Sequence, residues 1–195
     1  SDTNRLFSKG TKLIVRSSAL DEDKEGSTSA GKYESILNID SSDSIKLKHS
    51  INKVIKSYEE KGCESDYNQV IIQLMVEDIS MSGVIFTHDM NTGAPYYIVN
   101  YDDISGSTET VTSGCSEYSN RTLYIFRDKV DQLRSERFRS LINAVQELEL
   151  FEKNEYLDIE FAVSKSNEVI LLQARSINVK AKWDDLLSTK LNSLI

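Results

Sequence analysis

Four polar side chains near the C-terminal end of the chain have the types that a metal–phosphate ligand requires: Asp158, Glu160, Gln173 and Arg175. They lie in two predicted strands, 156–163 and 168–175, and side chains alternate between the two faces of a strand. A turn centred on 165–166 predicts that Asp158 lies opposite Gln173 and that Tyr156 lies opposite Arg175. All four polar groups are then expected on one face of this hairpin.

The apolar residues of the same two strands determine which face is buried. In the first strand the face opposite the acids carries Leu157, Ile159, Phe161 and Val163. In the second strand the predicted buried set is Ile170, Leu172 and Ala174, and the predicted polar face includes Val169 and Leu171. A slip of one residue exposes an apolar set, so the parity of the pairing is strongly specified.

This polar face has two interpretations. Magnesium prefers carboxylate oxygens together with phosphate oxygens and water, and arginine offers forked donors to phosphate. The face therefore suits Mg²⁺ and a polyphosphate. The alternative is a solvated sheet face with an ordinary ion pair, and the pattern alone favours that alternative because most such faces are simply exposed to water.

A second candidate site lies near the N-terminus, where Arg16 sits among apolar residues in LIVRSSA. Its guanidinium is expected to be partly enclosed, and an enclosed charge needs a partner or a ligand. The following loop, EGSTSAG (25–31), has small side chains that let backbone N–H groups approach an anion. It has neither the Walker A ending nor the GxGxxG pattern, and serine-rich turns are usually solvent loops.

Composition limits the classes of ligand and partner. The 195 residues include 23 basic and 31 acidic side chains, a formal net charge of −8, which argues against electrostatic binding to nucleic acid or to an anionic membrane. The apolar stretches are too short to span a bilayer, and the absence of a recognisable signal peptide predicts a cytoplasmic protein. Two cysteines and two histidines exclude a disulfide scaffold and a histidine-rich zinc site.

Hydrophobic periodicity predicts an α+β domain with a largely antiparallel sheet and packed helices. The other strands are expected over 12–19, 33–39, 70–76, 82–89, 95–101 and 122–127. Helices are expected over 43–60, 131–151 and 181–195, and a polar loop over 102–120. Strand 70–76 is apolar on both faces and is expected to be central. Segment 127–139 mixes charges of both signs and is interpreted as a solvated helix face.

Four motifs carry a family resemblance, in order along the chain. They are VRSSALDEDKEGSTSAGKYESILNI (15–39), VIIQLMV (70–76), SGVIFTHDMNTG (82–93) and LDIEFAV…VILLQARSI (157–177). Together they resemble the nucleotide-binding domain of phosphoenolpyruvate synthases and pyruvate phosphate dikinases. The resemblance implies the C-terminal part of an ATP-grasp domain, in which ATP and Mg²⁺ lie between two subdomains, and it favours the metal–phosphate interpretation. Residues 1–195 are expected to be one partial domain, with 181–195 as its C-terminal helix or linker.

The resemblance also implies roles for N-terminal residues. Arg16 would contact the ATP phosphates and take part in catalysis. Gly31 and Ser35 would belong to the flexible segment that covers the phosphates, with Ser35 in the place of the family's usual threonine. Gln73 would lie near the adenine end of the nucleotide.

For the C-terminal hairpin the resemblance implies that Glu160 and Gln173 are Mg²⁺ and ATP ligands. Asp158 would assist at the metal, and Arg175 would bind phosphate. The expected catalytic residues are Arg16, Glu160 and Arg175.

The implied reaction transfers a phosphoryl group from Mg-ATP to a histidine on another domain and then to a small acceptor, releasing AMP and phosphate. The family's lysine-bearing segment and phosphohistidine domain are not recognised here, and neither His49 nor His88 has a carrier context, so this chain alone is expected to be inactive. The family's GLGE is replaced by GSTE at 106–109, and its proline by Met90. The alternatives are a non-catalytic nucleotide-binding or regulatory module, a divergent kinase with an amide or hydroxyl acceptor, and an unrelated interaction domain.

Overall fold

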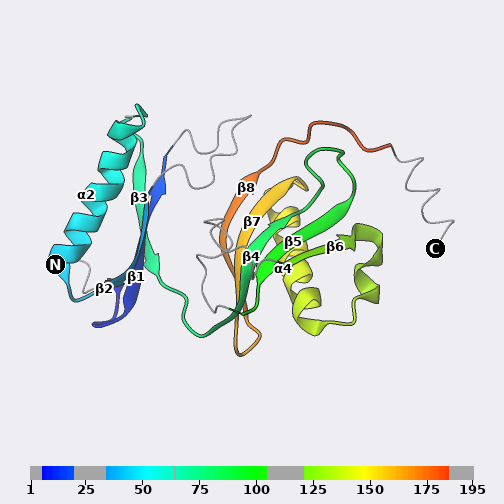
Figure 1. Ribbon diagram of the computed structural model, residues 1–195, viewed down its shortest axis with the longest axis horizontal. Helices are drawn as coiled ribbons and strands as arrows, with labels where there is room; N and C mark the ends of the chain where they lie inside the picture. Colours follow the sequence, from blue (N-terminus) through cyan, green and yellow to red (C-terminus); the bar gives the residue numbers. More distant parts are fainter. Residues whose placement is uncertain (1–5, 20–33, 64, 105–120, 185–195) are drawn as a thin grey trace. The chain divides into compact units, whose positions relative to one another are not determined.

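The computed structural model describes residues 6–19, 34–63, 65–104 and 121–184. They belong to two compact units, Ser1–Glu77 and Asp78–Ile195 (Figure 1). Each unit has an antiparallel sheet and an α-helix that packs on it, which confirms the predicted α+β class and is consistent with an ATP-grasp fold. No α-helix among these residues is long and apolar enough to cross a membrane.

The first unit packs α2 (Ser44–Glu60) on a sheet with the strand order β2–β1–β3. The strands are β1 (Lys12–Ser18), β2 (Ser35–Asp40) and β3 (Gln69–Leu74). The helix begins after Asp43, whose Oδ1 accepts a hydrogen bond of 2.9 Å from the Lys46 backbone N–H and so caps the helix. Its apolar side shares a buried cluster with the sheet, formed mainly by Leu13, Val15, Ile39, Leu47, Val54 and Tyr58.

β3 lies at the edge of this sheet and β1 at its centre, so the prediction of a central strand over 70–76 is wrong. Ile72 packs against the α2 cluster, whereas its neighbour Ile71 is 42% exposed and faces the other way. Apolar residues on both faces of a strand indicate that both faces are covered. They do not indicate whether both edges pair with other strands, and for this reason the pattern gave the wrong position in the sheet.

An extra residue in β2 adjusts how that strand faces α2. Leu13 pairs with Ile39, but Val15 pairs with Ile36, so β2 contains a bulge. Asn38 lies within it at a positive φ of 59°, a conformation that asparagine tolerates better than most residues. The bulge lets both isoleucines pack against the α2 cluster.

The second unit has a five-stranded antiparallel sheet in the order β6–β5–β4–β7–β8. Its strands are β4 (Ile79–Phe86), β5 (Tyr96–Asp102), β6 (Arg121–Phe126), β7 (Leu157–Ser164) and β8 (Val169–Ser176). The helix predicted over 131–151 is present as α4 (Glu136–Glu152), preceded by a 3-10 helix, η1 (Arg127–Gln132). One sheet face and α4 form the core, which includes Met81, Ile85, Tyr97, Phe138, Leu141, Ile142, Val145, Ile159 and Phe161.

After β8 the chain runs along the tip of the β4–β5 hairpin (Figure 1). The Lys180 backbone N–H donates a hydrogen bond of 2.9 Å to the Met90 carbonyl. Gly93 has a φ of 70°, and a Cβ there would overlap the carbonyl oxygen of Ala181, so the close approach requires glycine. Residues 181–184 of the predicted C-terminal helix are not helical, and its remainder lies outside the described residues.

Candidate functional site

The four polar residues of the C-terminal hairpin lie on one sheet face. Asp158 pairs directly with Arg175, and Glu160 pairs directly with Gln173, so the predicted convergence is confirmed. The predicted partners are wrong by two residues, because Asp158 was expected opposite Gln173 and Tyr156 opposite Arg175. A shift of two residues preserves the side-chain parity, and this is why the face was predicted correctly although the pairing was not.

The shift arises at a β-bulge halfway along the hairpin. Glu160 pairs with Gln173 but Phe161 pairs with Leu171, so Leu172 is an extra residue in β8. One extra residue reverses the alternation of faces. Consequently Val169 and Leu171 pack against the α4 core, which corrects their assignment to the polar face and the assignment of Ile170 and Leu172 to the buried one.

The charges of this acid–arginine cluster (Asp158, Glu160, Gln173 and Arg175) are only partly balanced. Arg175 Nη2 lies 3.5 Å from Glu160 Oε1, and both side chains are 13% exposed. Asp158 Oδ1 is buried and has no hydrogen-bond partner among the described residues. Burial raises the pKa of Asp158 to about 6, while the Arg175 charge opposes the rise and the Glu160 charge adds to it. A buried carboxylate oxygen without a donor favours a cation or a proton at this position.

The donor types of the cluster fit Mg²⁺ that is bound together with a phosphate. Two carboxylates and the Gln173 carboxamide supply the hard oxygen atoms that Mg²⁺ prefers, and the ion commonly completes its shell with phosphate and water. In the ranges that the structure describes, no group of three or more His, Cys, Asp or Glu could hold a metal by itself. The cluster therefore fits a metal–nucleotide ligand better than a free metal ion.

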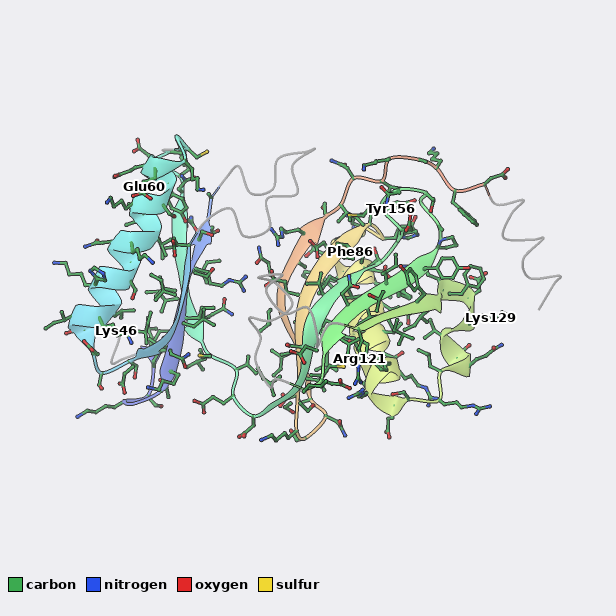
Figure 2. The ribbon with its side chains drawn as sticks, viewed as in Figure 1. Lys46, Glu60, Phe86, Arg121, Lys129 and Tyr156 are labelled. Atoms are coloured by element: carbon green, nitrogen blue, oxygen red, sulfur yellow. The ribbon has the colours of Figure 1, made fainter. Side chains whose placement is uncertain are left out.

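The neighbouring strand places apolar side chains beside the acids. Phe86 of β4 pairs with Asp158, and Val84 pairs with Glu160, so both lie on the sheet face opposite the α4 core. Phe86 lies at the same end of this unit as Tyr156 (Figure 2). A cluster of charged groups next to an apolar strip can contact both a charged and an uncharged part of one ligand.

Three predicted contacts of the first unit also share a sheet face, the one opposite α2. Arg16 pairs with Ser35 of β2 on one side and with Ile71 of β3 on the other. Gln73 lies two residues beyond Ile71, on the same face. Arg16 is half-buried, as its apolar neighbours predicted. Gly31 and the loop 25–31 lie outside the described residues.

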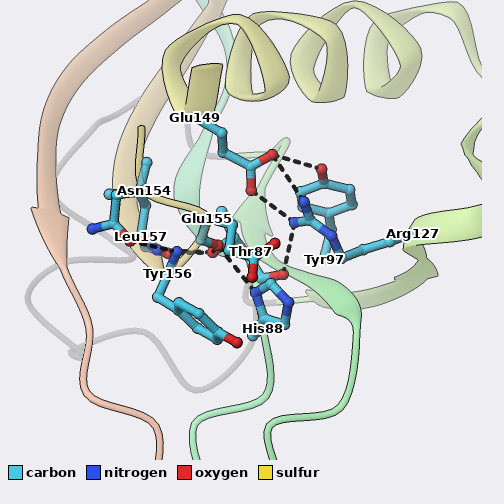
Figure 3. Close-up of polar contacts among 9 residues, drawn as sticks. All are labelled: Thr87, His88, Tyr97, Arg127, Glu149, Asn154, Glu155, Tyr156 and Leu157. Carbon is cyan, nitrogen blue, oxygen red and sulfur yellow. Dashed lines mark hydrogen bonds and ion pairs between the residues drawn. The ribbon is translucent and has the colours of Figure 1, made fainter. Parts of the chain in front are cut away.

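A buried polar network in the second unit was not predicted (Figure 3). Arg127 Nη1 and Nη2 donate to the two carboxylate oxygens of Glu149 at 2.7 and 3.1 Å, and the Tyr97 hydroxyl donates to Glu149 Oε2 at 3.0 Å. Glu149 is 8% and Arg127 19% exposed, so the solvated-face interpretation of 127–139 is wrong at Arg127. A usable signal was present, because Glu149 continues the apolar stripe of Ile142 and Val145 at helical spacing.

The two histidines occupy different environments. His49 is exposed on α2. His88 is 6% exposed, and its Nδ1 lies 3.0 Å from the Glu155 carbonyl oxygen. Its ring packs against the Tyr156 ring at a tilt of 34°, with centroids 4.5 Å apart. Burial, assisted by the Arg127 charge, lowers the pKa of His88. At neutral pH it is therefore a packed, uncharged ring.

Comparison with known protein families assigns the N-terminal part of the chain to a family. Residues 2–115 match the family described as pyruvate phosphate dikinase, AMP/ATP-binding domain. The matched range contains Arg16, Gly31, Ser35 and Gln73, and it ends before the strands that carry the acid–arginine cluster.

A curated relative extends the similarity further along the chain. The prodigiosin synthesizing transferase PigC of Serratia marcescens is 30% identical over an alignment 212 positions long, which covers 89% of this chain. The same alignment covers 23% of the relative, so the chain corresponds to less than a quarter of that protein.

Proposed function

The chain belongs to the AMP/ATP-binding domain family of pyruvate phosphate dikinase, and on this premise we propose that it binds Mg-ATP for a dikinase-like phosphotransferase. A phosphoryl group passes from ATP to a histidine on another domain and then to a small acceptor, releasing AMP and phosphate. The observation that carries the proposal is the acid–arginine cluster with its buried Asp158 oxygen, which no described residue hydrogen-bonds. We place the reaction in the cytoplasm because ATP is its donor.

In the second unit, Glu160 and Gln173 hold the metal–nucleotide ligand and Asp158 assists at the metal. Arg175, which is 13% exposed beside Glu160, donates to phosphate oxygens. The bound Mg²⁺ supplies charge neutralisation at the phosphates. The contribution of these residues is positioning and electrostatic stabilisation where negative charge develops.

In the first unit, Arg16 donates to the phosphates, and Gln73 on the same face contacts the adenine end. Ser35, which lies opposite Arg16, and Gly31 belong to the segment that covers the phosphates. We infer these roles of individual side chains from the family match of residues 2–115.

The acceptor is a separate question. The relative is named a prodigiosin synthesizing transferase, and this favours an acceptor other than pyruvate, such as an amide or a hydroxyl. The sequence change to GSTE at 106–109 favours the second candidate function, a nucleotide-binding or regulatory module without catalysis.

The test uses the full-length protein incubated with ATP and Mg²⁺, and it measures the formation of AMP. Glu160→Gln keeps the size of the side chain and is expected to lower the rate by about 100-fold or more. Glu168→Gln, an exposed acid beside β8, is the matched control and is expected to leave the rate unchanged.

Three other outcomes separate the alternatives. Tight Mg-ATP binding without AMP formation identifies the binding module. AMP formation that depends on an amide or hydroxyl substrate identifies the divergent kinase. Unchanged ATP affinity in a variant with alanine at both Arg16 and Arg175 contradicts a nucleotide site altogether.

A further inference from the structure

Thr87 belongs to the FTHDMNTG motif but has no role in the proposed function. It is completely buried, with 0% exposure, and it follows Phe86, the cross-strand partner of Asp158. Its cross-strand neighbour is therefore Leu157, the residue before Asp158. Any constraint that Thr87 places on Leu157 acts directly on the backbone that carries the Asp158 carboxylate.

The Thr87 hydroxyl replaces a backbone group in the pairing of β4 with β7. The Thr87 N–H donates to the Leu157 carbonyl at 3.0 Å, as in a regular antiparallel pair. The return bond goes instead from the Leu157 N–H to Thr87 Oγ1, at 2.8 Å. The same hydroxyl donates to the Glu155 carbonyl at 2.5 Å, so one side chain fixes the backbone on both sides of Tyr156.

Because the Thr87 hydroxyl accepts the bond from the Leu157 N–H, the Thr87 carbonyl is available for a different partner. Arg127 Nη1 donates to that carbonyl oxygen at 3.2 Å, and the same guanidinium is held by both carboxylate oxygens of Glu149 (Figure 3). Hydrogen bonds therefore run without interruption from α4 through Arg127 and Thr87 to Leu157.

Resting on the proposed function, we propose that Thr87 is a positioning residue for Asp158. Within the part of the chain that the structure describes, Asp158 Oδ1 has no hydrogen-bond partner, so the direction of this carboxylate depends strongly on its backbone. The Thr87 hydroxyl fixes the preceding residue and thereby directs the carboxylate toward the metal–phosphate ligand. Groups that orient ligand-binding side chains in this way typically contribute about 10- to 100-fold to affinity.

The first experiment compares Mg-ATP affinity among variants of the full-length protein. Thr87→Val removes the hydroxyl at nearly constant volume and is expected to weaken binding about tenfold, whereas Thr87→Ser is expected to retain affinity. Ser80→Ala is the matched control, because Ser80 Oγ also donates across the β4–β7 pair, to the Val163 and Ser164 carbonyls at 3.1 and 2.9 Å. It lies at the other end of β4, so affinity should be unchanged.

A second measurement separates positioning from a general loss of stability. In an Asp158→Asn background, Thr87→Val is expected to weaken binding no further, because both changes act through one carboxylate. If Thr87→Val does not fold, Thr87→Ala removes the same hydroxyl and carries the same expectation. Hydrogen exchange at the Leu157 amide should accelerate in either variant and remain slow in Thr87→Ser.

The outcomes distinguish this inference from the function on which it rests. If the wild-type protein fails to bind Mg-ATP, the proposed function falls and the positioning role falls with it. Normal wild-type binding that Thr87→Val leaves unchanged overturns the positioning role alone. The positioning role is likewise overturned if Thr87→Val weakens binding equally with and without the Asp158 carboxylate.

Discussion

The two units complete the end of a strand pair in similar ways but anchor it to their helices differently. In the first unit the Tyr58 hydroxyl of α2 accepts from the Ser18 N–H at 3.0 Å and donates to the Gln69 carbonyl at 2.7 Å. In the second unit Thr87, the residue after β4, makes a similar bridge between the Leu157 N–H and the Glu155 carbonyl. In both cases one hydroxyl serves two backbone groups, and one of them is an N–H that a regular ladder would pair with a carbonyl of the neighbouring strand.

The difference lies in what connects each bridge to the helix. Tyr58 is itself a helix residue, so a single neutral side chain joins α2 to the strand ends. In the second unit α4 reaches the strand end through the Arg127–Glu149 ion pair, which is mostly buried. The end of a strand pair can therefore be joined to its helix by a neutral group or by an ion pair. Only the ion pair is vulnerable to the loss of one charge.

The largest expected difference between the units comes from neutralising one acid in each helix. Glu149→Gln leaves the Arg127 charge buried without its carboxylate and should lower the free energy of unfolding by about 3 kcal/mol. Glu60→Gln removes the corresponding charge from the Lys56–Glu60 pair, whose side chains are 70% and 62% exposed, and should cost less than about 0.5 kcal/mol. Urea unfolding of both variants measures the difference, and equal losses would contradict the distinction between the two anchors.

Truncating one core valine in each helix should produce similar effects, because the apolar packing of the two helices is comparable. Val54 of α2 and Val145 of α4 are both 0% exposed. Replacing either by alanine is expected to lower the free energy of unfolding by about 2 kcal/mol. Thermal or urea unfolding tests this, and a markedly larger loss at either position would show that the difference between the units extends beyond their polar anchors.

The acids of the two units should respond to pH with opposite signs. Burial raises the pKa of Asp158 to about 6, so the folded state binds this proton more tightly than the unfolded state does. The free energy of unfolding therefore falls as pH rises from about 4 through about 6. Asp158→Asn removes this dependence. Between pH 4 and pH 7 its free energy of unfolding should therefore rise relative to that of the wild type, by on the order of 1–2 kcal/mol.

Asp40 of the first unit provides the contrast. The hydrogen bonds from the Ser42 side chain and backbone lower its pKa, so its contribution to stability is present above the ordinary carboxyl pKa and is lost as pH falls. Relative to wild type, Asp40→Asn should therefore lose stability as pH rises from about 2 to about 4, and it should change little at higher pH. Urea unfolding of each variant across its own pH range measures these trends, and a common sign would refute the assigned causes.

The smallest expected effect concerns the neutral bridge. Tyr58→Phe removes the hydroxyl that serves Ser18 and Gln69 and should lower the free energy of unfolding by about 1 kcal/mol, with faster hydrogen exchange at the Ser18 amide. Tyr67→Phe, whose side chain is 75% exposed, serves as the control and should change neither quantity. Unaltered exchange at Ser18 in Tyr58→Phe would mean that the hydroxyl does not hold this strand end.

Features that depend on local alternation could be predicted from the sequence. The shared face of Asp158, Glu160, Gln173 and Arg175 followed from the alternation of side chains along two strands, and it survived a pairing error of two residues. The helix over 43–60 followed in the same way from the spacing of its apolar residues.

Features that depend on long-range pairing could not be predicted. The extra residue at Leu172 reverses the faces of Val169 and Leu171, and no local pattern distinguishes it from its apolar neighbours. The edge position of β3 depends on which strands pair, not on the faces of the strand. The burial of Arg127 depends on Glu149, which lies 22 residues away in the sequence.

The contact between Gly93 and the chain after β8 has a consequence for engineering. The tip of the β4–β5 hairpin accepts a hydrogen bond from the Lys180 backbone and lies close to the Ala181 backbone. A surface turn of this kind is usually a tolerant place for a tag or an inserted sequence. Additional residues at 91–93 would displace the polypeptide that follows β8, including Lys180 and Ala181. Fusions that need a fixed geometry should leave this tip at its native length.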